Sequence, residues 1–166
     1  AFNRKPITMY PPDMTKGILD ALEIKAHARI LSVFDPCSGW GGRTLGTTCR
    51  GGHYTGCEPC IKTYRGLCKM IQELNIQELV TLYNKGVEDV IPTLHDTFYD
   101  VCLTSPPYYD LEVYSKEDSQ SIEKYKTYEL WVMNFIRPII EYVCEHVVYY
   151  SCWSVKNMGS SQPLLD

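Results

Sequence analysis

The stretch Thr104-Ser105-Pro106-Pro107-Tyr108 combines the groups that can hold a planar amine. It follows the apolar run 101–103, which predicts a buried strand. The two prolines cannot donate to a strand ladder and both fix φ, so the strand must stop at a rigid corner that exposes its last carbonyl groups. Oxygen acceptors at this corner can lie in the plane of an amine, and the Tyr108 ring can lie against its face. The stretch therefore predicts a site for a flat ring that carries an amino group.

A glycine-rich turn, Asp35-Pro36-Cys37-Ser38-Gly39-Trp40-Gly41-Gly42, follows the first predicted strand. Gly39 and Gly41 lack Cβ atoms, so a ligand can lie against the main chain there. Asp35 places a carboxylate at the strand end, and Glu58 ends the next predicted strand 23 residues later. A carboxylate at this second position can accept hydrogen bonds from both hydroxyls of a ribose. The glycines are too closely spaced for the Gly-x-Gly-x-x-Gly turn of a dinucleotide site, so the pattern argues against NAD.

The two motifs together resemble those of the amino-methyltransferases, which use S-adenosyl-L-methionine (AdoMet) to methylate an exocyclic amine of a nucleobase. Asp-Pro-x-x-Gly-x-Gly is similar to motif I of this family, and Thr-Ser-Pro-Pro-Tyr is similar to its motif IV. The Ser form resembles the cytosine-N4 branch, so DNA cytosine-N4 is the first expected target and adenine-N6 the second. By this resemblance the catalytic residues are Ser105, Pro106, Pro107 and Tyr108. By the same resemblance the cofactor-binding residues are Tyr10, Asp35, Pro36, Cys37, Gly39, Gly41, Glu58, Glu88, Asp89 and Thr104.

The resemblance also gives each part of AdoMet a partner. Asp35 would bind the methionine ammonium, with the glycine-rich turn under the methionine and ribose, and Glu58 would bind the ribose hydroxyls. Glu88 or Asp89, after the third predicted strand, would contact the adenine amino group, and the sequence does not choose between them. The segment Tyr10-Pro11-Pro12-Asp13-Met14-Thr15-Lys16 resembles motif X, which lies near the methionine end.

The exocyclic amine of a nucleobase is a poor nucleophile because its lone pair is conjugated into the ring. By the resemblance, Ser105 Oγ and the Pro106 carbonyl would accept hydrogen bonds from its N–H groups and turn the lone pair toward the methyl group. Tyr108 would stack on the base after the base leaves the helix. Little general-base chemistry is required, because the proton becomes acidic once the nitrogen is alkylated.

Short strands alternate with helices along the chain, which is the pattern of a parallel sheet covered by helices. The predicted strands are 28–34, 53–57, 79–83, 99–104 and 146–155. The predicted helices are 13–25, 43–49, 61–74, a short one at 90–94, and a long one at 122–143 that Pro138 bends or splits. The order predicts an α/β fold with a Rossmann-like, doubly wound, mostly parallel sheet and helices on both faces. In such a sheet both motifs lie beyond the carboxyl ends of the strands, where ligands bind.

We expect one AdoMet-dependent methyltransferase domain over residues 1–166. Its parts are a motif X-like segment and helix in 1–27, a catalytic core in 28–155 and a tail in 156–166. The resembled family adds two edge strands after the fifth, whereas the chain ends about ten residues beyond the predicted fifth strand. The expectation is therefore that the C-terminal edge strands and a target-recognition region are missing, because the chain is a fragment, because segments are absent from it, or because a second protein subunit completes the site.

Composition sets limits on the setting and the partners. Hydrophobic residues make up 45% and charged residues 22%, which is typical of a globular chain. The net charge of −4 argues against strong attraction of the whole surface to nucleic acid. Eight cysteines without a signal peptide indicate a reducing compartment, cytoplasmic or nuclear, and no apolar run is long enough to span a membrane. We expect a nucleic acid substrate, DNA in preference to RNA.

Three other interpretations remain open at this level. The same corner suits an RNA base methyltransferase. The acidic balance and the missing recognition region favour a non-catalytic methyltransferase-like subunit of a complex. The pair Cys57-x-x-Cys60, with Cys49 and His53 nearby, suggests zinc only weakly, because no second Cys-x-x-Cys pair accompanies it. We therefore expect no metal.

Overall fold

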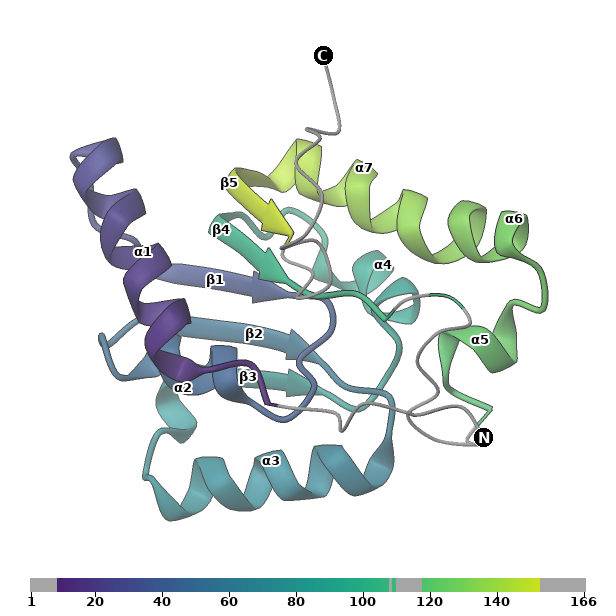
Figure 1. The fold of residues 1–166 in the computed structure, drawn as a ribbon, viewed down its shortest axis with the longest axis horizontal. Coiled ribbons are helices and arrows are strands. Elements are labelled where there is room, and N and C mark those ends of the chain that lie inside the picture. The colour runs from purple at the N-terminus through teal and green to yellow at the C-terminus, as the bar shows by residue number, and fades with distance from the viewer. Residues whose placement is uncertain (1–8, 108, 110–117, 153–166) are drawn as a thin grey trace, which may run out of the picture.

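Five parallel strands form one sheet, in the order β3-β2-β1-β4-β5, in this computed structural model (Figure 1). The structure describes residues 9–107, 109 and 118–152. The strands are β1 (Ser32–Asp35), β2 (His53–Cys57), β3 (Val80–Tyr83), β4 (Tyr99–Thr104) and β5 (Val147–Cys152).

Strand order reverses between β1 and β4. Strand β1 pairs with β2 on one side and with β4 on the other, where Val33 lies opposite Val101 and Phe34 opposite Cys102. The chain therefore moves toward one edge of the sheet through β2 and β3, and toward the other through β5. A doubly wound sheet binds its ligands in the crevice outside the strand ends at such a reversal.

Helices cover both faces of the sheet. The helices are α1 (Pro12–Ala26), α2 (Gly42–Thr48), α3 (Ile61–Glu73), α4 (Ile91–Leu94), α5 (Ser121–Lys124), α6 (Tyr128–Trp131) and α7 (Arg137–His146). Leu19 of α1 packs with Val33 and Leu103 on one face. Trp131 and Ile139, from α6 and α7, belong to the apolar cluster on the opposite face.

Three further helical turns lie in the described parts of the chain. Two are 3-10 turns, at Gln77–Leu79 and Val87–Asp89, and one is a π-helical turn at Val132–Ile136. No helix in the described parts of the chain combines the length and the apolar character that a membrane crossing requires.

The predicted α/β fold, with a doubly wound parallel sheet and helices on both faces, is confirmed. The predicted bounds of β2 and β4 also agree with the structure. The first strand was predicted too early, because it begins at Ser32 instead of residue 28. The reason lies in Asp100, whose Oδ2 accepts hydrogen bonds from the main-chain N–H groups of Leu31 and Ser32, both at 2.8 Å.

The helix predicted at 122–143 was expected to bend or split at Pro138, but it is interrupted at 125–127 instead. The chain leaves the helical conformation after α5, with Tyr125 extended at φ −116° and ψ 97°. Thr127 then caps α6, since its side chain accepts a hydrogen bond from the N–H of Leu130 at 3.2 Å. Pro138 lies in the first turn of α7, where its missing N–H is tolerated, and the π-helical turn comes just before it.

Candidate active site

The two sequence motifs meet at the reversal of strand order. Asp35 is the last residue of β1 and Thr104 the last residue of β4, and these strands are neighbours. Ser105, Pro106 and Pro107 continue from β4 and are each half-buried. Tyr108, the last predicted catalytic residue, lies outside the described residues.

Asp35 is fully buried and is the centre of an ion-pair network. Its Oδ2 accepts from Arg43 Nε at 2.7 Å and from the Tyr54 hydroxyl at 2.7 Å, while its Oδ1 accepts from the N–H of Cys37 at 3.2 Å. Burial alone would lower the pKa of Arg43, but the Asp35 carboxylate raises it overall, so the guanidinium stays charged. The network closes the turn onto β1, and the predicted contact between Asp35 and a methionine ammonium stays a prediction.

The same network ties the turn to β2. The Tyr54 hydroxyl lies 2.9 Å from Ser38 Oγ, and the Ser38 N–H donates to the Cys57 carbonyl at 2.9 Å. Burial raises the pKa of Tyr54 well above its usual value, so Tyr54 remains a neutral donor. Asp35, Ser38 and the end of β2 are thereby fixed relative to one another.

Glycine is required at Gly39 and Gly41 of the turn for different physical reasons. Gly39 and Gly41 have φ values of 57° and 86°, which favour a residue without a Cβ atom. A Cβ on Gly41 would lie 2.6 Å from Leu67 Cδ2 of α3, whereas a Cβ on Gly39 would meet nothing within 4 Å. The open face of the turn is therefore at Gly39, and Gly41 is needed for packing against α3.

Tyr10 joins the turn from the N-terminal side, and the motif X role of its segment stays a prediction. The Arg43 guanidinium carbon lies 5.2 Å from the centre of the Tyr10 ring, within the range of a cation–π contact. The Tyr10 carbonyl oxygen occupies the place where a Cβ on Gly42 would stand. The Tyr10 hydroxyl is buried and finds no hydrogen-bond partner among the described residues.

We expect the contact between Tyr10 and Gly42 to appear as a difference between two glycine substitutions. Gly42→Ala should lower the free energy of unfolding by about 1–3 kcal/mol, because the new methyl group displaces the main chain of Tyr10. Gly17→Ala, inside α1 with nothing within 4 Å, should raise it by about 0.5–1 kcal/mol. Urea unfolding of both variants measures the difference, and equal stabilities would contradict the packing described here.

Glu58 lies at the tip of β2 and is only 8% exposed. Its Oε1 accepts from the N–H of Cys60, the N-cap residue of α3, at 2.9 Å. Its main-chain carbonyl accepts from Asn84 Nδ2 at 2.8 Å, which links the tips of β2 and β3. The structure thus places Glu58 at the predicted edge and gives it a role in starting α3, while ribose binding stays a prediction.

The two neighbouring acids after β3 have different surroundings. The Glu88 side chain is 7% exposed and the Asp89 side chain is 55% exposed. Lys124 Nζ contacts both, at 2.8 Å from Glu88 Oε1 and at 2.5 Å from Asp89 Oδ2. Glu88 Oε2 is buried and has no hydrogen-bond partner in the described part of the chain. Of the two candidates, Glu88 is therefore the one that faces inward with a free acceptor.

The segment 118–125, which carries α5, lies beyond the carboxyl ends of β2 and β3 (Figure 1). Ser119 Oγ donates to the Pro59 carbonyl at 3.3 Å, and the Tyr125 hydroxyl lies 3.5 Å from Glu88 Oε1. Gln120 is 8% exposed. The chain that leaves the Pro-Pro corner thus returns to the side of the crevice where Glu58 and Glu88 lie.

Sequence reasoning missed three residues that hold this arrangement, namely Arg43, Tyr54 and Lys124. A signal was present for Arg43, because a basic residue in the first turn after the glycines can reach back to the strand-end acid. Lys124 gave no local signal, since its partner Glu88 is 36 residues away in the chain.

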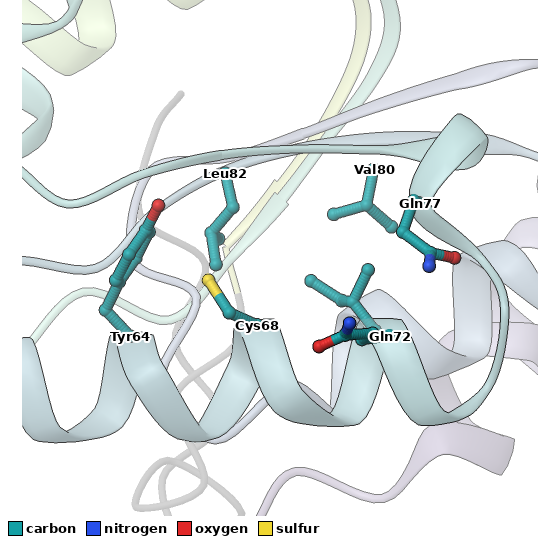
Figure 2. A pocket seen from close by; sticks show the side chains of 7 residues that line it. Tyr64, Cys68, Gln72, Gln77, Val80 and Leu82 are labelled. Atoms are coloured by element: carbon teal, nitrogen blue, oxygen red, sulfur yellow. The ribbon is translucent and has the colours of Figure 1, made fainter.

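Two features carry no part of the site. A hollow of about 360 Å³ lies between α3 and β3, and no predicted site residue lines it. Figure 2 shows its lining side chains, which include Tyr64, Cys68 and Leu82. Among the residues that the structure describes, no group of three or more His, Cys, Asp or Glu side chains is placed to hold a metal ion.

The fold is shared with solved structures of methyltransferases. The SAM-dependent methyltransferase from Agrobacterium tumefaciens matches with a TM-score of 0.58 and 13% identity, over 87% of this chain and 44% of that chain. Human methyltransferase 10 domain containing protein matches with 0.57 and 18%, over 89% and 65%. The delta-N METTL16 MTase domain matches with 0.57 and 16%, over 84% and 63%.

The chain spans less than two thirds of the length of each of these three proteins. No protein-family model matches the sequence, and no curated protein matches it. The comparisons therefore establish the α/β fold, which this chain shares with solved structures of methyltransferases.

Proposed function

We propose that the protein is an AdoMet-dependent methyltransferase that acts on an exocyclic amine of a nucleobase. The observation that carries the proposal is the pairing of β1 with β4, which sets the Asp35 turn beside the Thr104–Pro107 corner. A cofactor turn and an amine-binding corner at the same reversal of strand order supply both halves of a methyl-transfer site. The shared fold with proteins described as methyltransferases supports this.

The crevice fits a polar cofactor. Tyr10 Oη, Glu88 Oε2 and Thr104 Oγ1, on residues predicted to bind the cofactor, are among the buried side-chain atoms without a hydrogen-bond partner in the described chain. Buried polar groups in folded proteins are normally paired, so these atoms are candidates for ligand contacts. Glu88 would hold the adenine end, Glu58 the ribose, and the Asp35 turn with Tyr10 the methionine end. AdoMet supplies an electrophilic methyl group on a sulfonium.

The corner positions the amine for this methyl group. Ser105 Oγ and the Pro106 carbonyl would accept from the two N–H groups, so that the nitrogen lone pair points toward the sulfonium. The new N–C bond forms as the S–C bond breaks, and the amine then releases its proton. Holding two reactants in line in this way is worth about 7–11 kcal/mol in favourable intramolecular models. No strong base is required at the corner.

The choice of target base and of nucleic acid rests on the motif Thr104-Ser105-Pro106-Pro107-Tyr108. The Ser form of the corner favours cytosine-N4 in DNA, with adenine-N6 second and an RNA base as the alternative. The net charge of −4 favours another candidate, a methyltransferase-like subunit that binds AdoMet and needs a partner chain for nucleic acid.

Two measurements test the proposal. AdoMet should raise the melting temperature, because a ligand that binds only the native state stabilises it. Incubation with AdoMet carrying a labelled methyl group and with DNA or RNA, followed by mass spectrometry of the nucleosides, should give N4-methylcytosine. N6-methyladenine or a methylated ribonucleoside would select the other substrates. A thermal shift without any product would select the subunit, and no shift at saturating AdoMet would reject the cofactor.

A further inference from the structure

An exposed aromatic ring lies on α6, near the chain that leaves the Pro-Pro corner. Tyr128 is the first residue of α6 and is 58% exposed, whereas Trp131 in the same helix is only 8% exposed. Helix α6 lies on the carboxyl-end side of the sheet, which is also the side of the candidate active site (Figure 1). Tyr128 therefore presents a large aromatic surface to solvent close to the crevice.

Neighbouring aromatic rings hold the Tyr128 ring in this place. The ring of Tyr109 meets it edge to face, with the centroids 5.9 Å apart, and lies 5.8 Å from the ring of Trp131. Tyr128 stacks on Trp131 with the centroids 5.9 Å apart and an interplanar angle of 29°. Trp131 in turn contacts Phe135 within the apolar core. The Tyr128 ring is therefore anchored to the core although most of the residue is exposed.

Tyr109 connects these rings to the amine-binding corner. It comes two residues after Pro107, so their Cα atoms are at most about 7 Å apart. The ring of Tyr109 contacts that of Tyr128, so the exposed ring is one side chain away from the segment that follows the corner. A nucleotide that is adjacent in a strand to a base at the corner is therefore within reach of Tyr128.

The charges around Tyr128 favour a base over a phosphate as its ligand. The two nearest lysines in the preceding segment already have carboxylate partners, Lys124 with Glu88 at 2.8 Å and Lys126 with Glu123 at 2.6 Å. A phosphate would have to compete with these carboxylates, whereas stacking requires only the face of the ring. Bases in a duplex already stack on one another, so an unpaired strand is the form that offers a free base face.

We propose that Tyr128 is a stacking position for a nucleotide that flanks the target base, and that the substrate is a single-stranded nucleic acid. This inference rests on the proposed function, because it takes the corner as the place of the target base. Tyr109 and Trp131 are positioning residues, since they fix the Tyr128 ring and so reduce the conformational entropy lost on binding. Stacking accepts any base, so Tyr128 adds affinity for unpaired strands without reading their sequence.

The test measures binding by fluorescence anisotropy, with S-adenosylhomocysteine present. The probes are short labelled single strands of DNA and of RNA with a single cytosine or a single adenine, and the duplexes of the same strands. The wild-type protein should bind a single strand about tenfold or more tightly than its duplex. Tyr128→Ala should weaken single-strand binding about 10- to 100-fold, and Tyr128→Phe should retain it, because the ring stacks and the hydroxyl does not.

A strand with abasic sites on both sides of the single cytosine or adenine tests the same contact from the ligand. The wild-type protein should bind this strand about as weakly as Tyr128→Ala binds the intact strand. Tyr128→Ala should bind the abasic and intact strands almost equally, since the contact is already absent. A full further loss in Tyr128→Ala would show that the flanking base does not stack on Tyr128, and would overturn the inference.

Leu130→Ala is the matched control. Leu130 is also on α6 and is 49% exposed, but two residues along a helix place it about 200° around the axis from Tyr128. Its substitution should leave single-strand binding unchanged, and melting temperatures identify any variant that does not fold. The same loss in Leu130→Ala as in Tyr128→Ala would overturn the inference, because it would mark α6 as a contact surface for something other than one base.

The remaining outcomes separate the inference from the proposed function. Equal binding of single strands and duplexes by the wild-type protein, binding of neither, or unchanged binding in Tyr128→Ala would overturn the inference. Methyl transfer to a nucleobase alongside any of these results would leave the proposed function in place. The expected pattern of strand binding without methyl transfer to any strand would support the inference and reject the proposed function alone.

Discussion

Asp35→Ala should lower the free energy of unfolding by about 3–5 kcal/mol, the range expected when one partner of a buried ion pair is removed. The substitution leaves the Arg43 guanidinium charged and 5% exposed, without the carboxylate that compensates for its burial. It also removes the acceptor of the Tyr54 hydroxyl and of the Cys37 N–H. Denaturant unfolding measures the loss.

The control for Asp35→Ala is a double-mutant cycle with Arg43→Met. Each single substitution leaves one buried charge unpaired, whereas the double substitution leaves none. The double variant should therefore be more stable than the sum of the two single losses predicts. Losses at independent sites add to within about 0.3–0.5 kcal/mol, and the difference expected here is several times larger. Additive losses would show that Asp35 and Arg43 do not form the pair described here.

The strand positions were predictable wherever a local signal marks both ends of a strand. The Gly51-Gly52 pair precedes β2 and Glu58-Pro59 follows it, and the Pro-Pro corner ends β4. The start of β1 was not predictable, because it depends on Asp100, which reaches Leu31 from a strand 69 residues further along the chain. No local pattern reports such a contact.

The prediction of the helix at 122–143 failed for a different reason. Apolar residues recur at helical spacing through 122–143, and this periodicity continues across the break at 125–127. The break depends on the cap at Thr127 and on the contact of Lys124 with Glu88, which pulls α5 toward the tip of β3. Periodicity reports which side of a segment is buried, but it does not report a tertiary contact that turns the chain.

The site was predictable to the extent that topology alone brings residues together. Asp35 and Thr104 each end a strand and Glu58 directly follows one, so a doubly wound parallel sheet must place them at one edge. The polar partners of these residues come from elsewhere, and their choice depends on which side chain is buried beside which. The sequence for that reason left Glu88 and Asp89 equivalent, whereas burial in the structure separates them.

Tyr108→Ala should reduce kcat/KM for methyl transfer about 10- to 100-fold, since stacking of a base on an aromatic side chain is worth about 1–3 kcal/mol. The dissociation constant for AdoMet should change less than about twofold, because the proposed role of Tyr108 is on the substrate side of the corner. Transfer to the nucleic acid identified as substrate, together with calorimetry of AdoMet binding, measures the two effects separately.

Phe98→Ala is the matched control for Tyr108→Ala. Phe98 precedes Tyr99 at the opposite end of β4 and is 68% exposed, so its substitution removes an aromatic ring of similar size far from the corner. Transfer and AdoMet binding should both be retained in this variant. An equal loss of transfer and AdoMet binding in Tyr108→Ala would place Tyr108 in the cofactor site, and no loss of either would remove it from the mechanism. A selective loss of transfer in Tyr108→Ala alone would locate the substrate base at the corner.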